Sequence, residues 1–103
     1  MRAMNGSEID AVLRAEPGWK LQDGTLVREW KFADFLKAME FVNKIATLAE
    51  DAGHHPDIDI RYNRVRLGLV SHDAGGITER DAGMASRISK EFGATPAQSA
   101  AEG

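Results

Sequence analysis

Cysteine is absent from the 103 residues of this sequence. Its absence excludes disulfide bonds, thiolate metal ligands and a cysteine nucleophile. Long hydrophobic runs are lacking too, because none approaches the roughly twenty residues that a membrane-spanning helix needs. The first residues also lack the basic and then apolar pattern of a signal peptide. We therefore expect a cytoplasmic protein that makes no contact with a membrane.

An excess of positive charge is missing as well, since 13 Lys and Arg residues stand against 16 Asp and Glu residues. This balance argues against a nucleic-acid partner, because proteins that neutralise phosphates usually carry more Lys and Arg. The hydrophobic share of 43% is enough for a packed core. The length suits one domain, which we place at residues 1–93. Residues 94–103 are small and polar, and we expect them to form a disordered tail.

The sequence does contain three helical patterns with end signals. The first helix is expected to begin near Ser7 and to stop at Pro17, the second to be capped by Asp34, and the third by Thr78. Gly53 and Gly93 are expected to end the second and third helices. The residues expected to face the core are, in the second helix, Phe35, Met39, Val42, Ala46 and Ala49, and in the third, Met84, Ala85, Ile88 and Phe92.

Two stretches of alternating polar and apolar residues predict two β-hairpins. The first covers residues 19–32 and turns at Asp23-Gly24, and the second runs from residue 57 to His72 with a turn at Asn63-Arg64. The predicted fold is therefore α+β, in the order α-β-β-α-β-β-α, with a four-stranded antiparallel sheet and three helices packed on one face. The open face and edges of such a sheet predict a homo-oligomer.

All three histidines of the chain fall at the ends of predicted elements. His54 and His55 precede the third strand, and His72 follows the fourth. The second hairpin brings these two points to the same end of the sheet, so we expect the three imidazoles to meet there. Glu50 and Asp81 lie near enough for a carboxylate to orient an imidazole and favour its charged form. Such imidazoles are suited to donate and accept protons near neutral pH.

Each of these residues also has a simpler interpretation. Asp81 follows Thr78 by three residues and could serve only in a helix cap, and Glu50 alone could be a solvated residue at a helix end. Trp19 could be a core aromatic or could stack on a flat ring. The basic cluster of Arg61, Arg64 and Arg66 is interpreted as solvated surface that counters nearby aspartates, with contact to a partner as the alternative.

Zinc is the alternative use of three histidines. The spacing disfavours it, because adjacent histidines such as His54 and His55 rarely converge on one ion and no His-x-x-x-His pair is present. We therefore predict no metal and no cofactor.

A larger set of residues resembles the signature of the pterin-4a-carbinolamine dehydratases: Glu50, His54-His55-Pro56, Tyr62, His72 and Asp81. The resemblance covers roughly residues 18–88. It implies the α+β fold, assembly into dimers or tetramers, and a catalytic set of His54, His55, His72, Glu50 and Asp81. It also implies substrate contacts by Trp19, His55 and Pro56. One departure is Ser71, because family members often have Thr immediately before the last histidine.

The activity that the resemblance implies is loss of the 4a-hydroxyl group from a hydroxytetrahydropterin. The product would be a quinonoid dihydropterin, as in tetrahydrobiopterin recycling, and the histidines would supply general acid and base. Two alternatives stay open. The chain could be a non-catalytic protein-binding module, such as a dimerisation or assembly cofactor, or a dehydratase that acts on a related pterin.

Overall fold

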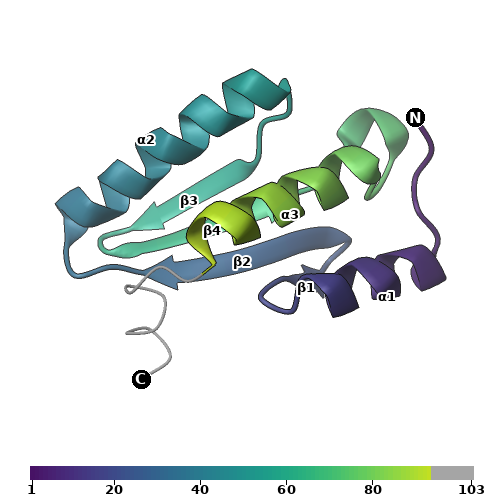
Figure 1. Cartoon of the computed structure of the whole chain (residues 1–103), viewed down its shortest axis with the longest axis horizontal. Coiled ribbons are helices and arrows are strands. Elements are labelled where there is room, and N and C mark those ends of the chain that lie inside the picture. Colours follow the sequence, from purple (N-terminus) through teal and green to yellow (C-terminus); the bar gives the residue numbers. More distant parts are fainter. Residues whose placement is uncertain (94–103) are drawn as a thin grey trace.

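The computed structural model describes residues 1–93, so the predicted tail at residues 94–103 lies outside the described residues. The predicted order of three helices and four strands is confirmed, with one short 3-10 helix in addition (Figure 1). The elements are α1 (Gly6–Ala15), β1 (Lys20–Gln22), β2 (Thr25–Lys31), α2 (Phe35–Ala52), β3 (Asp57–Arg61), β4 (Arg64–Leu69), η1 (His72–Ala74) and α3 (Glu79–Phe92).

The four strands form one antiparallel sheet in the order β1-β2-β4-β3. The first hairpin turns at Asp23-Gly24 as predicted, and both residues have positive φ. The second turn lies one residue earlier in the chain than the predicted turn at Asn63-Arg64. Arg61 pairs with Arg64, which leaves Tyr62 and Asn63 as the two turn residues, and Tyr62 adopts a φ of 54°.

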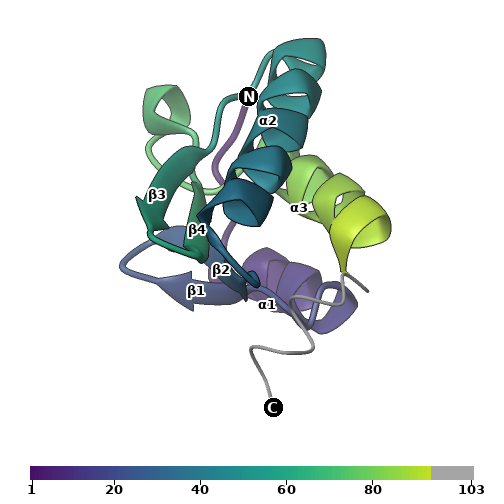
Figure 2. The same ribbon diagram turned by 90° about the vertical axis from the view of Figure 1, so that its left-hand side faces the viewer.

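The helices cover one face of the sheet, as expected. Figure 2 shows α2 and α3 beside each other on the same side of the strands. Between the layers lies a cluster of aromatic rings in which Trp30 is completely buried. Its ring centroid lies 4.8 Å from that of Phe41 and 6.1 Å from that of Trp19. These edge-on and tilted contacts are the geometries that aromatic pairs prefer.

The start of α1 differs from the prediction. The cap is Asn5, and Ser7 lies inside the first turn. The side chain of Asn5 accepts a hydrogen bond from the backbone N–H of Glu8, while the Glu8 carboxylate accepts one from the backbone N–H of Asn5. Ser7 also has an acid three residues later, Asp10, so the spacing of a capping box alone does not distinguish the two positions.

The buried stripe of α2 also differs from the prediction. The expected positions are exposed or half-buried, except for Ala49. The buried residues of the helix are Ala38, Phe41, Ile45, Leu48 and Ala49. Both sets recur every three or four residues, and the contact with the sheet selects the second set. The stripe predicted for α3 is confirmed, since Met84, Ala85 and Ile88 are buried and Phe92 packs against the core.

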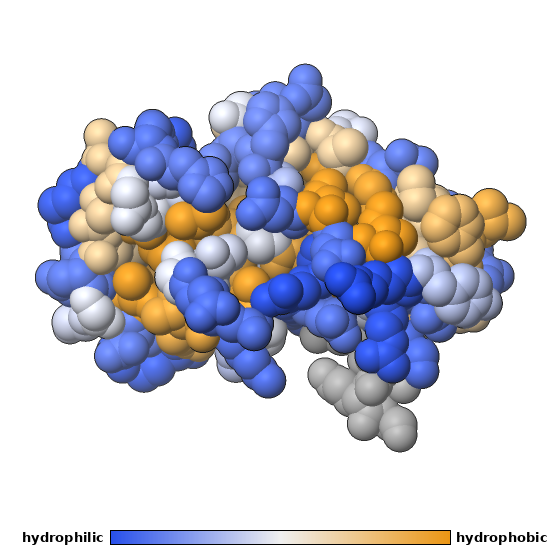
Figure 3. All heavy atoms as spheres, turned by 180° about the vertical axis from the view of Figure 1, so that it is seen from behind, coloured by the Kyte–Doolittle hydropathy of each residue, from blue (hydrophilic) through white to orange (hydrophobic). Residues whose placement is uncertain are grey.

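The other face of the sheet is open, and its surface is mixed. In Figure 3, which faces the side away from α2 and α3, hydrophilic side chains cross the surface between hydrophobic patches. Arg66 donates to the Gln22 side chain there at 2.6 Å, and Arg64 lies 3.7 Å from Glu29. Arg61 lies 3.3 Å from Asp59, so the contacts of Arg61 and Arg64 fit the interpretation of the basic cluster as a surface countered by acids. No helix within residues 1–93 is long and apolar enough to cross a membrane.

Candidate active site

The end of α2 delivers two histidines to one end of the sheet. Gly53 ends the helix with a φ of 66°, a left-handed conformation that glycine adopts without steric cost. The next residue, His54, donates its backbone N–H to the carbonyl of Ala49 at 3.2 Å. The chain therefore leaves the helix in a fixed direction before β3 begins at Asp57.

The imidazole of His54 is paired with the carboxylate of Asp81. Its Nε2 lies 2.6 Å from Oδ1 of Asp81, the side chain of His54 is 11% exposed, and that of Asp81 is completely buried. Because a carboxylate can only accept, Nε2 of His54 carries the hydrogen of this bond. Nδ1 is the ring nitrogen that does not take part in this bond.

The other oxygen of Asp81 has a structural role. Oδ2 accepts hydrogen bonds from the hydroxyl of Ser71 at 2.8 Å and from the backbone N–H of Thr78 at 2.9 Å. Asp81 thus completes the capping box that begins α3 and also holds His54. Asp81 therefore makes both kinds of contact, the helix cap through Oδ2 and the contact with His54 through Oδ1.

His55 forms a second pair, with Glu50, on the surface. Its Nε2 is hydrogen-bonded to Oε2 of Glu50, and the two side chains are 64% and 76% exposed. Solvent weakens such a pair far more than the buried one. The two adjacent histidines therefore lie in different environments, each with its own carboxylate.

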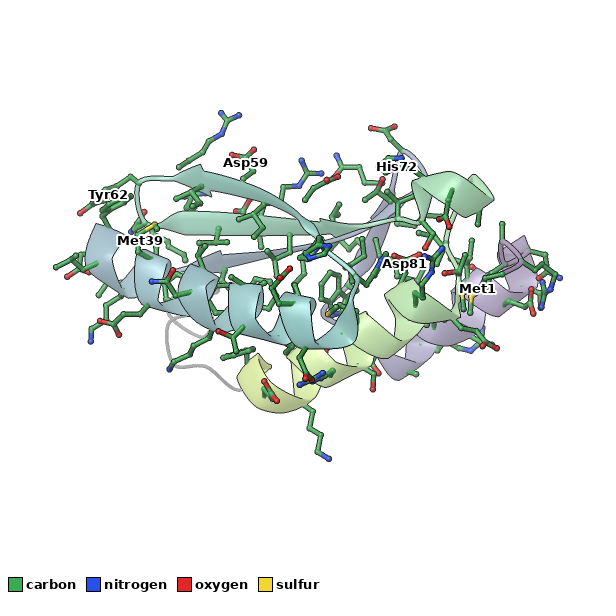
Figure 4. The ribbon with its side chains drawn as sticks, turned by 90° about the horizontal axis from the view of Figure 1, so that it is seen from above. Met1, Met39, Asp59, Tyr62, His72 and Asp81 are labelled. Atoms are coloured by element: carbon green, nitrogen blue, oxygen red, sulfur yellow. The ribbon has the colours of Figure 1, made fainter. Side chains whose placement is uncertain are left out.

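His72 lies at the same end of the molecule as Asp81, as Figure 4 shows. Within residues 1–93 its exposed side chain makes no hydrogen bond or ion pair. The contact of Ser71 with Asp81 connects the segment that carries His72 to the pair formed by His54. Within residues 1–93 no hydrogen bond joins two of the three rings, and the expected meeting of the three imidazoles stays a prediction.

A tight loop carries His72. Residues His72–Ala74 form a 3-10 turn, which is closed by backbone hydrogen bonds between Ser71 and Gly76. Asp73 of this loop is bonded at 2.6 Å to Arg80 in the first turn of α3. The hydrogen bond from the Arg80 guanidinium lowers the pKa of Asp73 below its ordinary value.

Trp19 is not brought together with the histidines. The ring is 2% exposed, and its Nε1 donates to the hydroxyl of Ser89 at 3.0 Å. Ser89 lies eight residues after Asp81 on α3, which is about 12 Å along the helix axis. In this chain Trp19 is a core residue. Pro56, another of the three predicted substrate contacts, is half-buried between His55 and β3.

The described part of the chain holds no group of three histidine, aspartate or glutamate side chains arranged to bind a metal ion. The sequence marked Ser71 only as a departure from the family, and it did not indicate that Ser71 and Arg80 support the site. The further signal was their proximity in the chain to His72 and Asp81. Their roles depend on contacts between β4, η1 and α3, which alternation and helical spacing do not reveal.

Comparison with known proteins identifies the family. The family described as "Pterin 4 alpha carbinolamine dehydratase" matches residues 2–91. The chain belongs to this family of hydro-lyases, and the resemblance noted in the sequence is thereby confirmed.

Individual relatives agree with this assignment. A protein from Acidobacterium capsulatum that carries the family's dehydratase name is 57% identical over 85% of this chain and 96% of its own length. One from Chloroflexus aurantiacus with the same name is 50% identical over 90% of this chain and 100% of its own. A crystal structure described as a transcriptional coactivator/pterin dehydratase from Brucella melitensis matches with a TM-score of 0.80 and 36% identity, over 86% of this chain and 97% of that one.

Proposed function

We propose that this protein dehydrates a 4a-hydroxytetrahydropterin to a quinonoid dihydropterin and water by general acid and base catalysis. The observation that carries the proposal is the pair formed by His54 and the buried Asp81. A carboxylate in this position fixes both the orientation and the tautomer of the imidazole. Family membership supplies the substrate class.

The reaction needs one proton to be donated and one to be removed. The bond between C4a and the hydroxyl oxygen breaks, and the oxygen leaves as water after it receives a proton. The proton on ring N5 is removed, and its electron pair forms the double bond between N5 and C4a. The reaction eliminates water without net oxidation or reduction, so it requires no external oxidant or reductant. Acid and base groups are therefore sufficient, and we propose no metal or cofactor.

His54 and His72 are the proposed donor and acceptor of these protons. In its neutral form, His54 donates its Nε2–H to Asp81 and can accept a proton at Nδ1. The resulting imidazolium then donates that proton from Nδ1. His72 is exposed and lies at the same end of the sheet. We assign binding or shared proton transfer to His55, whose ring Glu50 orients, and a substrate contact to Pro56.

A second function is favoured by one comparison. The matching Brucella melitensis structure is described as a transcriptional coactivator as well as a pterin dehydratase. The corresponding hypothesis for this chain is a protein-binding module that uses the helices or the open sheet face. Capture of a stoichiometric protein partner, together with no dehydration of any pterin, would replace the first proposal by this one.

We also propose that the protein is a homodimer or homotetramer. Two large side chains at the start of α2, Phe35 and Leu36, are 47% and 71% exposed, and Tyr62 in the β3–β4 turn is 66% exposed. Strands β1 and β3 each have an unpaired edge within the described sheet. Light scattering of the purified protein tests this proposal, and a monomer at micromolar concentration would contradict it.

The direct test of the proposed activity is a set of dehydration assays with several 4a-hydroxytetrahydropterins in parallel. The uncatalysed dehydration of each compound is the baseline. We expect acceleration of at least one of them, unchanged after dialysis against EDTA. Rates equal to the baseline for every pterin would contradict the proposal, and comparison of the kcat/KM values identifies the preferred substrate.

A further inference from the structure

We propose that Ser71 is a positioning residue of the active site, which acts through Asp81 on His54. Ser71 lies just outside the predicted catalytic set, and it is 2% exposed in a loop where a serine would ordinarily face water. The inference rests on the proposed function for its effect on the reaction rate. Its structural part, that Ser71 holds the pair formed by Asp81 and His54, can be tested without any substrate.

The hydroxyl of Ser71 can donate its hydrogen to only one of its two partners. Its single hydrogen points to Oδ2 of Asp81 at 2.8 Å, because a carboxylate can only accept. The contact of 2.9 Å between the hydroxyls of Ser71 and Thr78 must therefore have Thr78 as the donor. The hydroxyl oxygen of Thr78 in turn accepts the backbone N–H of Arg80 at 3.2 Å. The result is a chain of donors in which every member points toward Asp81.

This chain of donors keeps a buried charge in place. The exposed fraction of both Asp81 and Thr78 is zero, so water does not solvate the carboxylate. A buried carboxylate is stable only when hydrogen-bond donors replace its lost water. Ser71 and the backbone of Thr78 hold Oδ2, which leaves Oδ1 to point at His54. Without the Ser71 hydroxyl, one donor holds Oδ2 and the carboxylate gains freedom to rotate.

The same residue fixes the loop of His72. Its backbone N–H donates to the carbonyl of Gly76 at 2.9 Å, and its carbonyl accepts from Ala74 and Gly76. Ser71 thus closes the 3-10 turn with its backbone and contacts Asp81 with its side chain. One residue therefore sets the position of His72 relative to His54, and no other described residue makes both contacts.

The experiment compares Ser71→Ala with Ser71→Thr, which keeps the hydroxyl, and with Asn63→Ala as a matched control. Asn63 donates its side chain to the carbonyl of Phe32 at 2.7 Å in the β3–β4 turn, at the opposite end of the sheet. The control removes one partly buried side-chain hydrogen bond without touching the histidines. Thermal unfolding of all three variants reports the cost to the fold.

Two readouts separate positioning from a general loss of stability. The first is the downfield proton NMR signal of Nε2–H in His54, assigned by its absence from His54→Gln. We expect Ser71→Ala to shift or broaden this signal and Ser71→Thr and Asn63→Ala to leave it in place. The second is steady-state kinetics. We expect kcat to fall about tenfold in Ser71→Ala, the effect of one hydrogen bond to a charged group, with KM nearly unchanged.

An unchanged His54 signal and unchanged kcat in folded Ser71→Ala would overturn the inference, and so would an equal effect of Asn63→Ala. If Ser71→Ala does not fold, Ser71→Cys carries the test, because it keeps the volume and weakens the donor. Wild-type protein without activity on any pterin would refute the proposed function alone. The NMR comparison would still decide whether Ser71 positions the pair.

Discussion

Nε2 of His54 lies 2.6 Å from Oδ1 of Asp81, and this carboxylate is completely buried. The second pair of the site, between His55 and Glu50, is exposed to solvent. The chain therefore combines one largely buried imidazole with one that is exposed to solvent. This difference in burial predicts a difference in how much each carboxylate contributes to stability and activity.

Replacing Asp81 by Asn is expected to cost both stability and activity. Both oxygens of Asp81 accept hydrogen bonds, whereas the amide nitrogen of asparagine can only donate. That nitrogen would face a donor, either Ser71 and Thr78 or His54, so at least one buried hydrogen bond is lost. We expect the free energy of unfolding to fall by about 1–3 kcal/mol and kcat by about 100-fold. Denaturant unfolding and steady-state assays measure the two effects. Asp51→Asn, which removes an exposed carboxylate of α2, is the control, and equal effects of both variants would contradict this prediction.

Replacing Glu50 by Gln is expected to have a much smaller effect. Exposed ion pairs contribute about 0–1 kcal/mol to stability, and glutamine can still contact the ring of His55. We expect unfolding free energies within about 0.5 kcal/mol of each other and a loss of kcat/KM smaller than that of the Asp81 variant. A loss as large as that variant's would mean that His55, and not His54, is the main catalytic group.

The pKa of Asp73 is expected to depend on Arg80. The hydrogen bond from Arg80 lowers this pKa below 3.8, so Arg80→Gln should raise it toward 3.8. The contribution of this pair to stability is present above that pH and is lost as the pH falls through the lowered pKa. Carboxyl-carbon NMR titration measures the shift. Arg87→Gln, which breaks the surface bridge from α3 to Asp51 of α2, should leave the titration of Asp73 unchanged.

Glu8 is expected to make the fold sensitive to acid. The Arg2 side chain first, and then the backbone N–H of Asn5, lower the pKa of Glu8 from 4.5 to about 2. Its stabilising contribution is therefore fully present above pH 4.5 and is lost as the pH falls toward 2. In Glu8→Gln the free energy of unfolding should change less over this window than in wild-type protein. Identical pH dependence in the two proteins would show that the capping box does not contribute.

The fold was largely predictable because local patterns determine most of its elements. Alternation and the Asp23-Gly24 turn indicated the first hairpin, and Asp34 and Thr78 marked the starts of two helices. The errors occurred where the sequence offers two equivalent choices. Asn5 and Ser7 can each cap a helix, and only the reciprocal contact with Glu8 selects the first.

The stripe of α2 and the support of the site needed the tertiary structure. Phe41 and Ile45 have the same helical spacing as the predicted stripe, so only the direction of the sheet decides between them. That Asp81 could reach an imidazole was predictable from its place in the first turn of the third helix, but its pairing with His54 in particular was not. The role of Ser71 could not be predicted either, because it depends on a buried contact between a loop and the first turn of α3 that no periodicity records.

The most direct test of the central claim is the rate of carbinolamine dehydration by His54→Ala and His72→Ala. General acid and base catalysis predicts a loss of about 100-fold or more in each variant. Lys44→Ala, an exposed change on α2, serves as the control and should keep the wild-type rate. Both histidine variants at the wild-type rate, with their fold intact, would contradict the claim that these side chains transfer the protons.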